Sequence, residues 1–488
     1  MEAELVATTR GVCPVCRRIL PASVLRQGQD VRLERVCPEH GRSLSLLSSD
    51  ADFYLKSLSI IKPGTVPLEF STPIRRGCPE DCGLCPSHEQ HTCMPIIEIT
   101  ERCDLDCPIC LVESGRGRRR GGDLSLAEVG AILDTLVRTE GTLELINISG
   151  GEPTLHPEIR DIIRLCGRPE IVRTSISTNG LRLAEDDALL DFLVAQNVLV
   201  SLQFDGFSGD VCRRLRGADI LAAKDKLLAK MEERQAPLSL VVTVAKNVNE
   251  GEIGGILDYF FRHDHVVSLM FQPLSHTGRR EGPPFNPQDR LTVPDVIRLI
   301  AAYSAGRLER GDFTPLPCSH PACFALTYLL RLEDGSLTPL PRLVSVETCL
   351  DIIRNRSLPG LDSGSFARIK DGLYEIWSSS GTAPDSQKVL STVKSMMQEI
   401  LGAGREFSPR AALAVGERRV KSIFIHHFMD EDNFDLARAV RCCSHYPLPD
   451  GRLMPACTYN VLFRPRPDGG HTSGTADRAD RLGEGKEG

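Results

Sequence analysis

Residues 95–110 read PIIEITERCDLDCPIC, a short apolar segment followed directly by three cysteines. The apolar part, PIIEIT, predicts a buried β-strand, because it is short and rich in isoleucine. Cys103, Cys107 and Cys110 follow with the spacing C-x3-C-x2-C. We therefore expect the three thiols in the loop that leaves this strand.

Strands and helices alternate after that loop, up to about residue 275. The predicted strands, including the first, are PIIEIT, LELINIS, IVRTSIS, VLVSLQF, LSLVVTV and VVSLMFQ. The predicted helices between them span about 125–138, 157–166, 186–195, 219–232 and 252–264. This alternation predicts an α/β fold whose parallel sheet has right-handed crossovers. Six units are too few for a complete eight-stranded barrel, so we expect a partial (βα)6 TIM-like barrel with its active residues at the C-terminal strand ends.

Composition narrows the class of protein. The chain has 488 residues, of which 41% are hydrophobic and 25% charged, so a wholly disordered chain is excluded. The net charge of -7 argues against binding to a nucleic-acid backbone. No apolar run approaches the ~18 residues of a membrane span, and no secretory signal is predicted. We expect a cytoplasmic protein with, at most, peripheral access to a membrane.

The eighteen cysteines are many for a chain without an export signal. Cytosolic thiols stay reduced, so grouped cysteines indicate metal binding more than disulfides. Cys166 and Cys212 stand alone and are expected to be ordinary buried thiols. The grouping predicts a metal knuckle over 1–60, a Cys-rich auxiliary segment over 61–95, the barrel over 96–275, a C-terminal α+β domain with auxiliary iron–sulfur ligands over 291–463, and a disordered tail over 464–488. A linker is expected over 276–290.

Four groups of ligands are predicted. Cys13, Cys16, Cys37 and His40 suit one tetrahedral iron or zinc. A second group of four thiolates suits a closed cluster or a rubredoxin-type iron. The adjacent residues Cys442 and Cys443 are expected to face different ways. The second group is Cys78, Cys82, Cys85 and Cys93, and the C-terminal candidates are Cys318, Cys323, Cys349, Cys442, Cys443 and Cys457, with Cys349 the weakest.

The remaining group, Cys103, Cys107 and Cys110, is incomplete. Three thiolates can hold three irons of a 4Fe–4S cube and leave the fourth iron without a protein ligand. An open coordination position is what a catalytic metal needs, whereas a structural zinc loop would need a fourth ligand close by.

Several segments, taken in order, resemble the radical SAM superfamily. SGGEP at 149–153 ends the second strand and resembles the glycine-rich segment that approaches the methionine part of S-adenosylmethionine. SISTNG at 175–180 ends the third strand and resembles the ribose-contacting segment. The resemblance implies that S-adenosylmethionine is contacted by Ile109, Ser149, Gly150, Gly151, Glu152, Pro153, Ser177, Thr178, Asn179, Gly180, Ser201, Gln203, Asp205 and Asn249. Ile109 departs from the family, which often has an aromatic residue there.

The whole-chain pattern resembles a narrower group that contains archaeal tetraether lipid synthases and pterin-methylating relatives. The resemblance implies that a reduced 4Fe–4S cluster cleaves S-adenosylmethionine and that the resulting 5′-deoxyadenosyl radical takes hydrogen from an unactivated sp3 carbon. We expect carbon–carbon bond formation on a lipid chain, with methyl or methylene transfer to a pterin or other small heterocycle as the alternative. A long apolar tunnel at the barrel mouth would favour the lipid, and a short polar pocket the pterin.

Partners and further cofactors follow from the same resemblance. It implies one or more auxiliary 4Fe–4S clusters, which could relay electrons or hold a substrate radical, and an electron donor such as ferredoxin or flavodoxin. An iron–sulfur electron carrier or sensor is the non-enzymatic alternative, but a carrier has no use for an S-adenosylmethionine site. The basic loop containing Arg116, Arg118, Arg119 and Arg120 is read as solvated, although it could steer an anionic head group.

Overall fold

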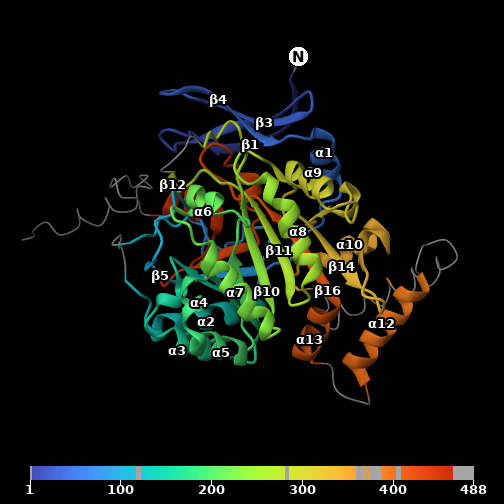
Figure 1. Cartoon of the computed structure of the whole chain (residues 1–488). Helices are drawn as coiled ribbons and strands as arrows, with labels where there is room; N and C mark the ends of the chain where they lie inside the picture. The colour runs from blue at the N-terminus through green and yellow to red at the C-terminus, as the bar shows by residue number, and fades with distance from the viewer. Residues whose placement is uncertain are drawn as a thin grey trace, which may run out of the picture.

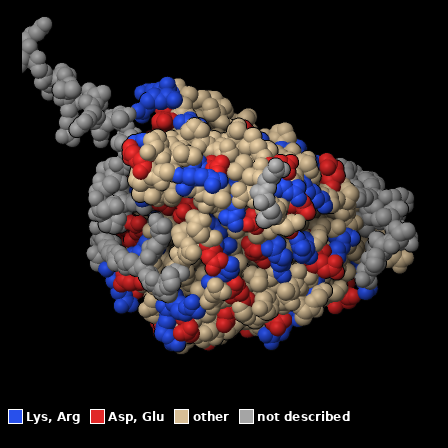
Figure 2. Space-filling view, turned by 90° about the horizontal axis from the view of Figure 1, so that it is seen from above, with Lys and Arg blue, Asp and Glu red and all other residues tan. Residues whose placement is uncertain are grey.

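The computed structural model describes residues 3–116, 122–280, 285–358, 368, 372, 386–402 and 408–464. Arg118, Arg119, Arg120 and the predicted disordered tail beyond Arg464 lie outside the described residues. In the described part, no helix combines the length and the apolar character needed to cross a membrane. Over the face shown in Figure 2, acidic and basic side chains are interspersed.

A twelve-stranded sheet organises the molecule (Figure 1). Six adjacent parallel strands form its centre, as the sequence predicts. They are β5 (Met94–Thr100), β7 (Leu143–Gly150), β8 (Ile171–Thr178), β9 (Leu199–Gln203), β10 (Leu238–Val244) and β11 (Val266–Pro273). Their apolar side chains pack under the helices in one large core cluster.

The helices between these strands cover the outside of the sheet. In α2 (Leu126–Glu140), the buried residues Val129, Ile132, Leu133 and Leu136 recur at helical spacing, and a Ser125–Glu128 capping box begins the helix. The predicted helices are confirmed as α2, α3 (Ile159–Leu165), α5 (Asp187–Ala195), α7 (Leu221–Glu233) and α8 (Ile253–Arg262). Two further short helices, α4 (Leu181–Glu185) and α6 (Gly209–Arg216), were not predicted.

The C-terminal region extends the barrel sheet at both edges instead of forming a sheet of its own. β16 (Val420–His426) pairs in parallel with β11, and β17 (Ser444–Pro447) pairs in parallel with β5. β14 (Phe324–Arg331) then pairs antiparallel with β16. Unpaired sheet edges are unfavourable, and these strands cover both edges of the six-stranded centre.

Two hairpins lie in this region. β14 turns into β15 (Leu337–Pro339), and β17 turns into β18 (Leu453–Pro455). The other described elements of the region are α9 (Val293–Tyr303), β13 (Thr314–Pro315), α10 (Val346–Ile353), α12 (Ser386–Leu401), α13 (Pro409–Arg419), α14 (Leu436–Ala439) and α15 (Ala456–Thr458).

The N-terminal knuckle is a separate antiparallel sheet that lies against one end of the barrel (Figure 1). Arg35 is buried and donates to the carbonyl oxygen of Asp432 at 2.6 Å, and Thr9 donates to the Asp435 carboxylate at 2.6 Å. Both partners belong to the loop that follows β16. The strands are β1 (Glu4–Val12), β2 (Ile19–Gln27), β3 (Asp30–Cys37) and β4 (Gly41–Ser48), followed by helix α1 (Ala51–Ser59).

Candidate active site and metal centres

The loop that carries Cys103, Cys107 and Cys110 leaves the C-terminal end of β5, as predicted. All three thiols are half-buried. Burial raises the pKa of Cys103 to about 12 and also raises the pKa of Cys110. Metal binding would remove these thiol protons. Three thiols on one short loop are a donor set that suits an iron–sulfur cluster.

A two-stranded ribbon contacts and supports the same loop. β6 (Ile109–Cys110) pairs with β12 (Arg279–Arg280), and the Arg279 side chain donates to the carbonyl oxygen of Cys107 at 2.9 Å. Gly278 has a φ of +77°, and a Cβ there would lie 2.3 Å from the carbonyl oxygen of Cys110. Only glycine permits this approach. The segment predicted to be a linker therefore supports the cluster loop.

Glu152 joins the two glycine-containing segments. Its carboxylate is buried and accepts hydrogen bonds from Thr178 Oγ1 at 2.8 Å and from the backbone N–H of Asn179 at 2.7 Å. It also accepts from the hydroxyl of Thr154 at 2.6 Å and from the backbone N–H of Thr154 at 3.1 Å. These four bonds occupy the carboxylate. Glu152 thus positions its neighbours, and its side chain offers little to a bound cofactor.

The same segments also contact the cluster loop. Asn179 donates to the carboxylate of Asp104, between the first two cysteines, at 2.6 Å. The backbone N–H groups of Gly151 and Glu152 donate to the carbonyl oxygens of Thr100 and Arg102 at 2.8 and 2.6 Å. Ser149 to Pro153, Ser177 to Gly180 and the cluster loop are therefore brought together at one edge of the barrel.

A buried ion pair lies beside the cluster loop. Arg216 makes two hydrogen bonds to Asp205, at 2.7 and 2.8 Å, and also hydrogen-bonds the thiol of Cys107. Lys224 donates to the carbonyl oxygens of Asn179 and Gln203, and burial lowers its pKa to about 8. Sequence reasoning found Gln203 and Asp205. It missed Arg216 and Lys224, because each lies on a helix with no motif of its own.

Three more predicted cofactor contacts have distinct surroundings. Ile109 is buried in an apolar cluster with Val211 and Leu215 at the barrel mouth. Asn249 is buried, and its amide bonds the backbone of Asp205, Thr243 and Ala245. Asn249 therefore fixes the ends of β9 and β10. Ser201 lies on β9 with its side chain facing the barrel cavity described below.

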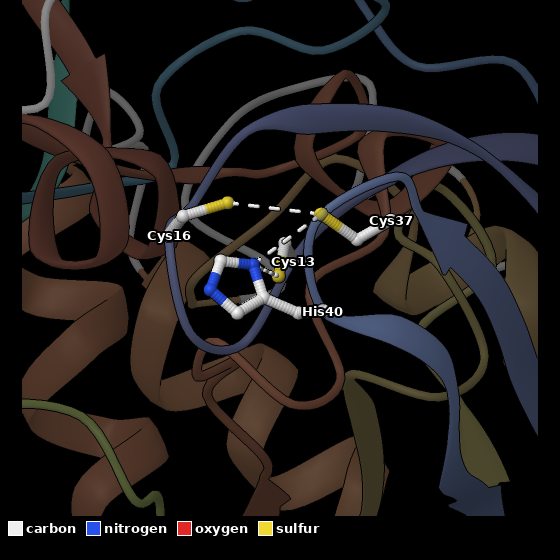
Figure 3. Close-up of side chains that lie close together, drawn as sticks. All are labelled: Cys13, Cys16, Cys37 and His40. Carbon is white, nitrogen blue, oxygen red and sulfur yellow. Dashed lines mark hydrogen bonds between the residues drawn. The ribbon is translucent and has the colours of Figure 1, made fainter.

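The knuckle brings its four predicted ligands to one point (Figure 3). One ligand atom each from Cys13, Cys16, Cys37 and His40 lies within 4.8 Å of every other. His40 Nδ1 is 3.6 Å from the Cys13 sulfur and 3.5 Å from the Cys37 sulfur. Thiolates and an imidazole converging in this way suit one tetrahedral ion.

Two family models match the chain. The radical SAM superfamily matches residues 97–260, and the HMPTM N-terminal zinc ribbon domain matches residues 5–49. The 7,8-dihydro-6-hydroxymethylpterin dimethyltransferase of Methanocaldococcus jannaschii is 31% identical over 480 residues, which cover 93% of this chain and 94% of that protein. The chain belongs to the radical SAM superfamily. Membership implies a 4Fe–4S cluster and S-adenosylmethionine, and it makes the chain an enzyme instead of an electron carrier.

Other similarities cover less of the radical SAM chain. A GTP 3',8-cyclase of Listeria monocytogenes is 28% identical over 200 residues, 40% of this chain and 59% of that protein. The solved structure of Streptococcus suis SuiB bound to precursor peptide SuiA is 17% identical, with 43% of this chain and 45% of that chain covered and a TM-score of 0.37. The dimethyltransferase name agrees with the pterin alternative and not with the lipid reaction that we expected first.

The auxiliary cysteines of this radical SAM chain fall into groups that differ from those predicted. Cys93 hydrogen-bonds Cys443, which together with burial raises the pKa of Cys93, and Cys318 adds to this shift. The backbone N–H of Cys93 also donates to the carbonyl oxygen of Cys443 at 3.0 Å. Cys93 therefore groups with C-terminal cysteines, although its spacing predicted a site with Cys78, Cys82 and Cys85.

The remaining C-terminal cysteines differ in their surroundings. Burial raises the pKa of Cys442, and the thiols of Cys457, Cys443 and Cys323 raise it further. Arg438 donates to the Cys323 sulfur at 3.2 Å. Cys443 is therefore close to Cys442 and Cys323 as well as to Cys93, and these C-terminal thiols form one connected neighbourhood. Cys349 packs in a separate apolar cluster with Leu330, Leu332, Val344 and Val389, away from these groups.

A cavity of about 430 Å³ fills the interior of the radical SAM barrel. Val420 and His426, at opposite ends of β16, both line it, so it runs about 20 Å at ~3.3 Å per residue. Polar side chains line it at both ends, and apolar side chains line the length between them. Asn147, Ser177 and Gln272 lie towards the C-terminal strand ends, whereas Arg173, Ser239 and Glu417 lie towards the opposite end; examples of the apolar set are Leu145, Leu199, Leu326 and Leu413.

Proposed function

We propose that this radical SAM enzyme transfers a methyl or methylene unit to a carbon atom of a pterin or similar heterocycle. The observation that carries the proposal is the match along nearly the whole chain to a relative named as a pterin dimethyltransferase. The polar cavity wall supports it, since Asn147, Ser177 and Gln272 offer donors and acceptors to a heterocycle.

When bound, the cluster and S-adenosylmethionine supply a 5′-deoxyadenosyl radical. In the proposal, Cys103, Cys107 and Cys110 bind the cluster, and the backbone beside Gly150 and Gly151 faces the methionine. Ile109 provides an aliphatic wall for the adenine. Asp205 and Arg216 hold the end of β9 against Cys107.

The cavity favours a second candidate. Its length and its apolar walls suit an extended alkyl chain, as carbon–carbon bond formation on a lipid requires. Cys93 and Cys443 both line the cavity. In this candidate, a cluster on these thiols would lie beside the alkyl chain.

One anaerobic assay separates the two candidates. The reconstituted enzyme is incubated with S-adenosylmethionine and a reductant, together with either 6-hydroxymethyl-7,8-dihydropterin or vesicles of isoprenoid diether lipid. The pterin proposal expects 5′-deoxyadenosine and a pterin in which a methyl group has replaced a hydrogen atom, a net gain of CH2, with a second S-adenosylmethionine as the methyl donor that leaves as S-adenosylhomocysteine. Cys103→Ala should abolish both products, whereas Cys349→Ser should retain them because Cys349 lies in an apolar cluster. A lipid that loses hydrogen, with an unchanged pterin, would overturn the pterin proposal.

A further inference from the structure

Cys78, Cys82 and Cys85 share the C-x3-C-x2-C spacing of the core cysteines. The three thiols line one small cavity. Like the core set, they could hold three irons of a 4Fe–4S cube and would leave the fourth iron without a thiolate. Cys93 does not line this cavity, and its backbone N–H donates to the carbonyl oxygen of Cys443 at 3.0 Å, so we look for the fourth ligand among the residues that do line it.

His88 lines the same cavity, three residues after Cys85. Its ring is 6% exposed, and its backbone N–H donates to the carbonyl oxygen of Cys85 at 2.8 Å. The next residue, Glu89, donates its backbone N–H to the carbonyl oxygen of Val440 at 2.7 Å. These bonds fix the backbone that carries His88 at the cavity lined by the three thiols.

We infer that His88 is the fourth protein ligand of an iron–sulfur cluster held by Cys78, Cys82 and Cys85, and that it binds iron through Nδ1. The inference does not depend on which substrate the enzyme uses. It makes this cluster coordinatively closed, whereas the cluster on Cys103, Cys107 and Cys110 keeps an open iron.

Hydrogen bonding identifies the nitrogen that is free to bind. His88 Nε2 lies 2.7 Å from the carbonyl oxygen of Cys442. A carbonyl oxygen can only accept, so Nε2 carries the proton, and Nδ1 keeps its lone pair. His445 Nε2, 3.2 Å from His88 Nε2, then lies on the accepting side. A ring N–H donated to a backbone carbonyl is the usual arrangement of a metal-binding histidine.

The surroundings suit a cluster with one neutral ligand. Ala439, Val440 and Pro455 line the cavity together with Thr458 and keep it largely apolar. In an apolar site, an imidazole in place of a fourth thiolate lowers the negative charge of the cluster. Replacement of thiolate by histidine raises the reduction potential of iron–sulfur clusters. This cluster should therefore accept an electron at a higher potential than the same cluster with four thiolates.

Pulsed EPR on the whole reconstituted chain tests the assignment. Cys103, Cys107 and Cys110 are first changed to Ala, and S-adenosylmethionine is left out, so the core cluster contributes no signal. A reduced cluster should show the 14N coupling of a directly bound imidazole. That coupling should vanish in H88C, which keeps the iron content and has a lower midpoint potential, and it should persist in H445Q.

A second variant keeps the test decisive if the first one does not bind the cluster. If H88Q loses the cluster, H88C still reports the ligand, because a thiolate can replace the imidazole. A coupling that survives in H88C overturns the inference, as does its absence in the parent. A coupling lost in H445Q but retained in H88C would assign the ligand to His445. An unchanged iron content after Cys82→Ala would show that the three thiols hold no cluster.

Discussion

At the scale of single residues, Glu152 links the two segments that we propose contact S-adenosylmethionine. It is fully buried and accepts four hydrogen bonds from two segments that are distant in sequence. Burial raises the pKa of its carboxyl group, while the hydrogen bonds from Thr154, Asn179 and Thr178 oppose that shift. The Glu152 carboxylate and the hydrogen-bond donors of the two segments thus fix one another's positions.

Glu152→Gln should destabilise the enzyme and weaken S-adenosylmethionine binding. An amide replaces one acceptor oxygen with an NH2 group, so at least one buried donor loses its partner, at a cost of about 1–3 kcal/mol. The free energy of unfolding in urea and the affinity for S-adenosylmethionine measure the two effects. Glu158→Gln, at an exposed position on the same segment, should change neither. If both variants had the same stability and the same affinity for S-adenosylmethionine, Glu152 would not have this positioning role.

The residues found from sequence share a property that the missed ones lack. Cys103, Gly151 and Asn179 belong to short motifs at strand ends, where the chain order itself places them together. Arg216 and Lys224 reach the site from helices, and His88, which we propose as a ligand, lies in a segment whose spacing favoured Cys93 instead. Their roles depend on which distant backbone each side chain meets, and no local spacing encodes that.

At the scale of elements, the ribbon of β6 and β12 shows how a segment without a motif supports the cluster loop. Gly278, which precedes β12, lies so close to the backbone of Cys110 that there is no space for a Cβ atom. Gly306 has a nearly equal φ, +79°, but a Cβ there would meet no atom within 4 Å. Substitution of both glycines therefore introduces backbone strain, but only substitution of Gly278 also introduces a steric clash.

Gly278→Ala should remove the core cluster, whereas Gly306→Ala should leave it in place. Both substitutions carry the cost of a left-handed residue, about 1–2 kcal/mol. Only the first also pushes β12 away from Cys110. Iron content and 5′-deoxyadenosine formation measure the result, and Gly278→Ala should lose the iron of one cluster. Full activity in Gly278→Ala would show that the ribbon tolerates displacement.

Strands were predictable as elements, and their pairing was predictable only between neighbours in sequence. The six barrel strands follow one another through helices, so chain order gives sheet order. Residues 420–426 are also strand-like in sequence, yet their pairing with β11 spans a long intervening region. The same holds for Ser444, which pairs with Met94. The hydrophobic pattern predicts that a segment is a strand, but it does not predict which strand distant in sequence it pairs with.

At the scale of the whole molecule, the knuckle is tied to the barrel through the loop that follows β16. The Arg35 guanidinium is buried between the two parts, and β1 forms a bridge from Gly11 to Asp435. Its four candidate metal ligands lie at the ends of β1 and β3 and in the turns that follow them. A metal ion bound at these ligands and the contact with the loop after β16 would therefore both stabilise β1 and β3.

Removing the knuckle metal with a chelator should loosen both the knuckle and the loop over 427–435. Without the ion, four ligand groups lose their common partner, and β1 to β4 retain only a small apolar core. Hydrogen exchange should become faster in both regions. Arg35→Ala should speed exchange in the loop while the metal stays bound. Unchanged exchange in 427–435 after chelation would show that the two parts are independent.

The order of strands along the chain has a consequence for biogenesis. During synthesis, β5 to β11 and the core cysteines leave the ribosome long before β16 and β17, which cover the edges of the sheet. The nascent chain can therefore receive its catalytic cluster while the apolar cavity is still open along one side. Cys93 can meet Cys443, and Cys442 can meet Cys457, only when the C-terminal end of the chain has been made. A chain stalled near residue 420 would carry a loaded active site inside an unsealed barrel and would be prone to aggregate.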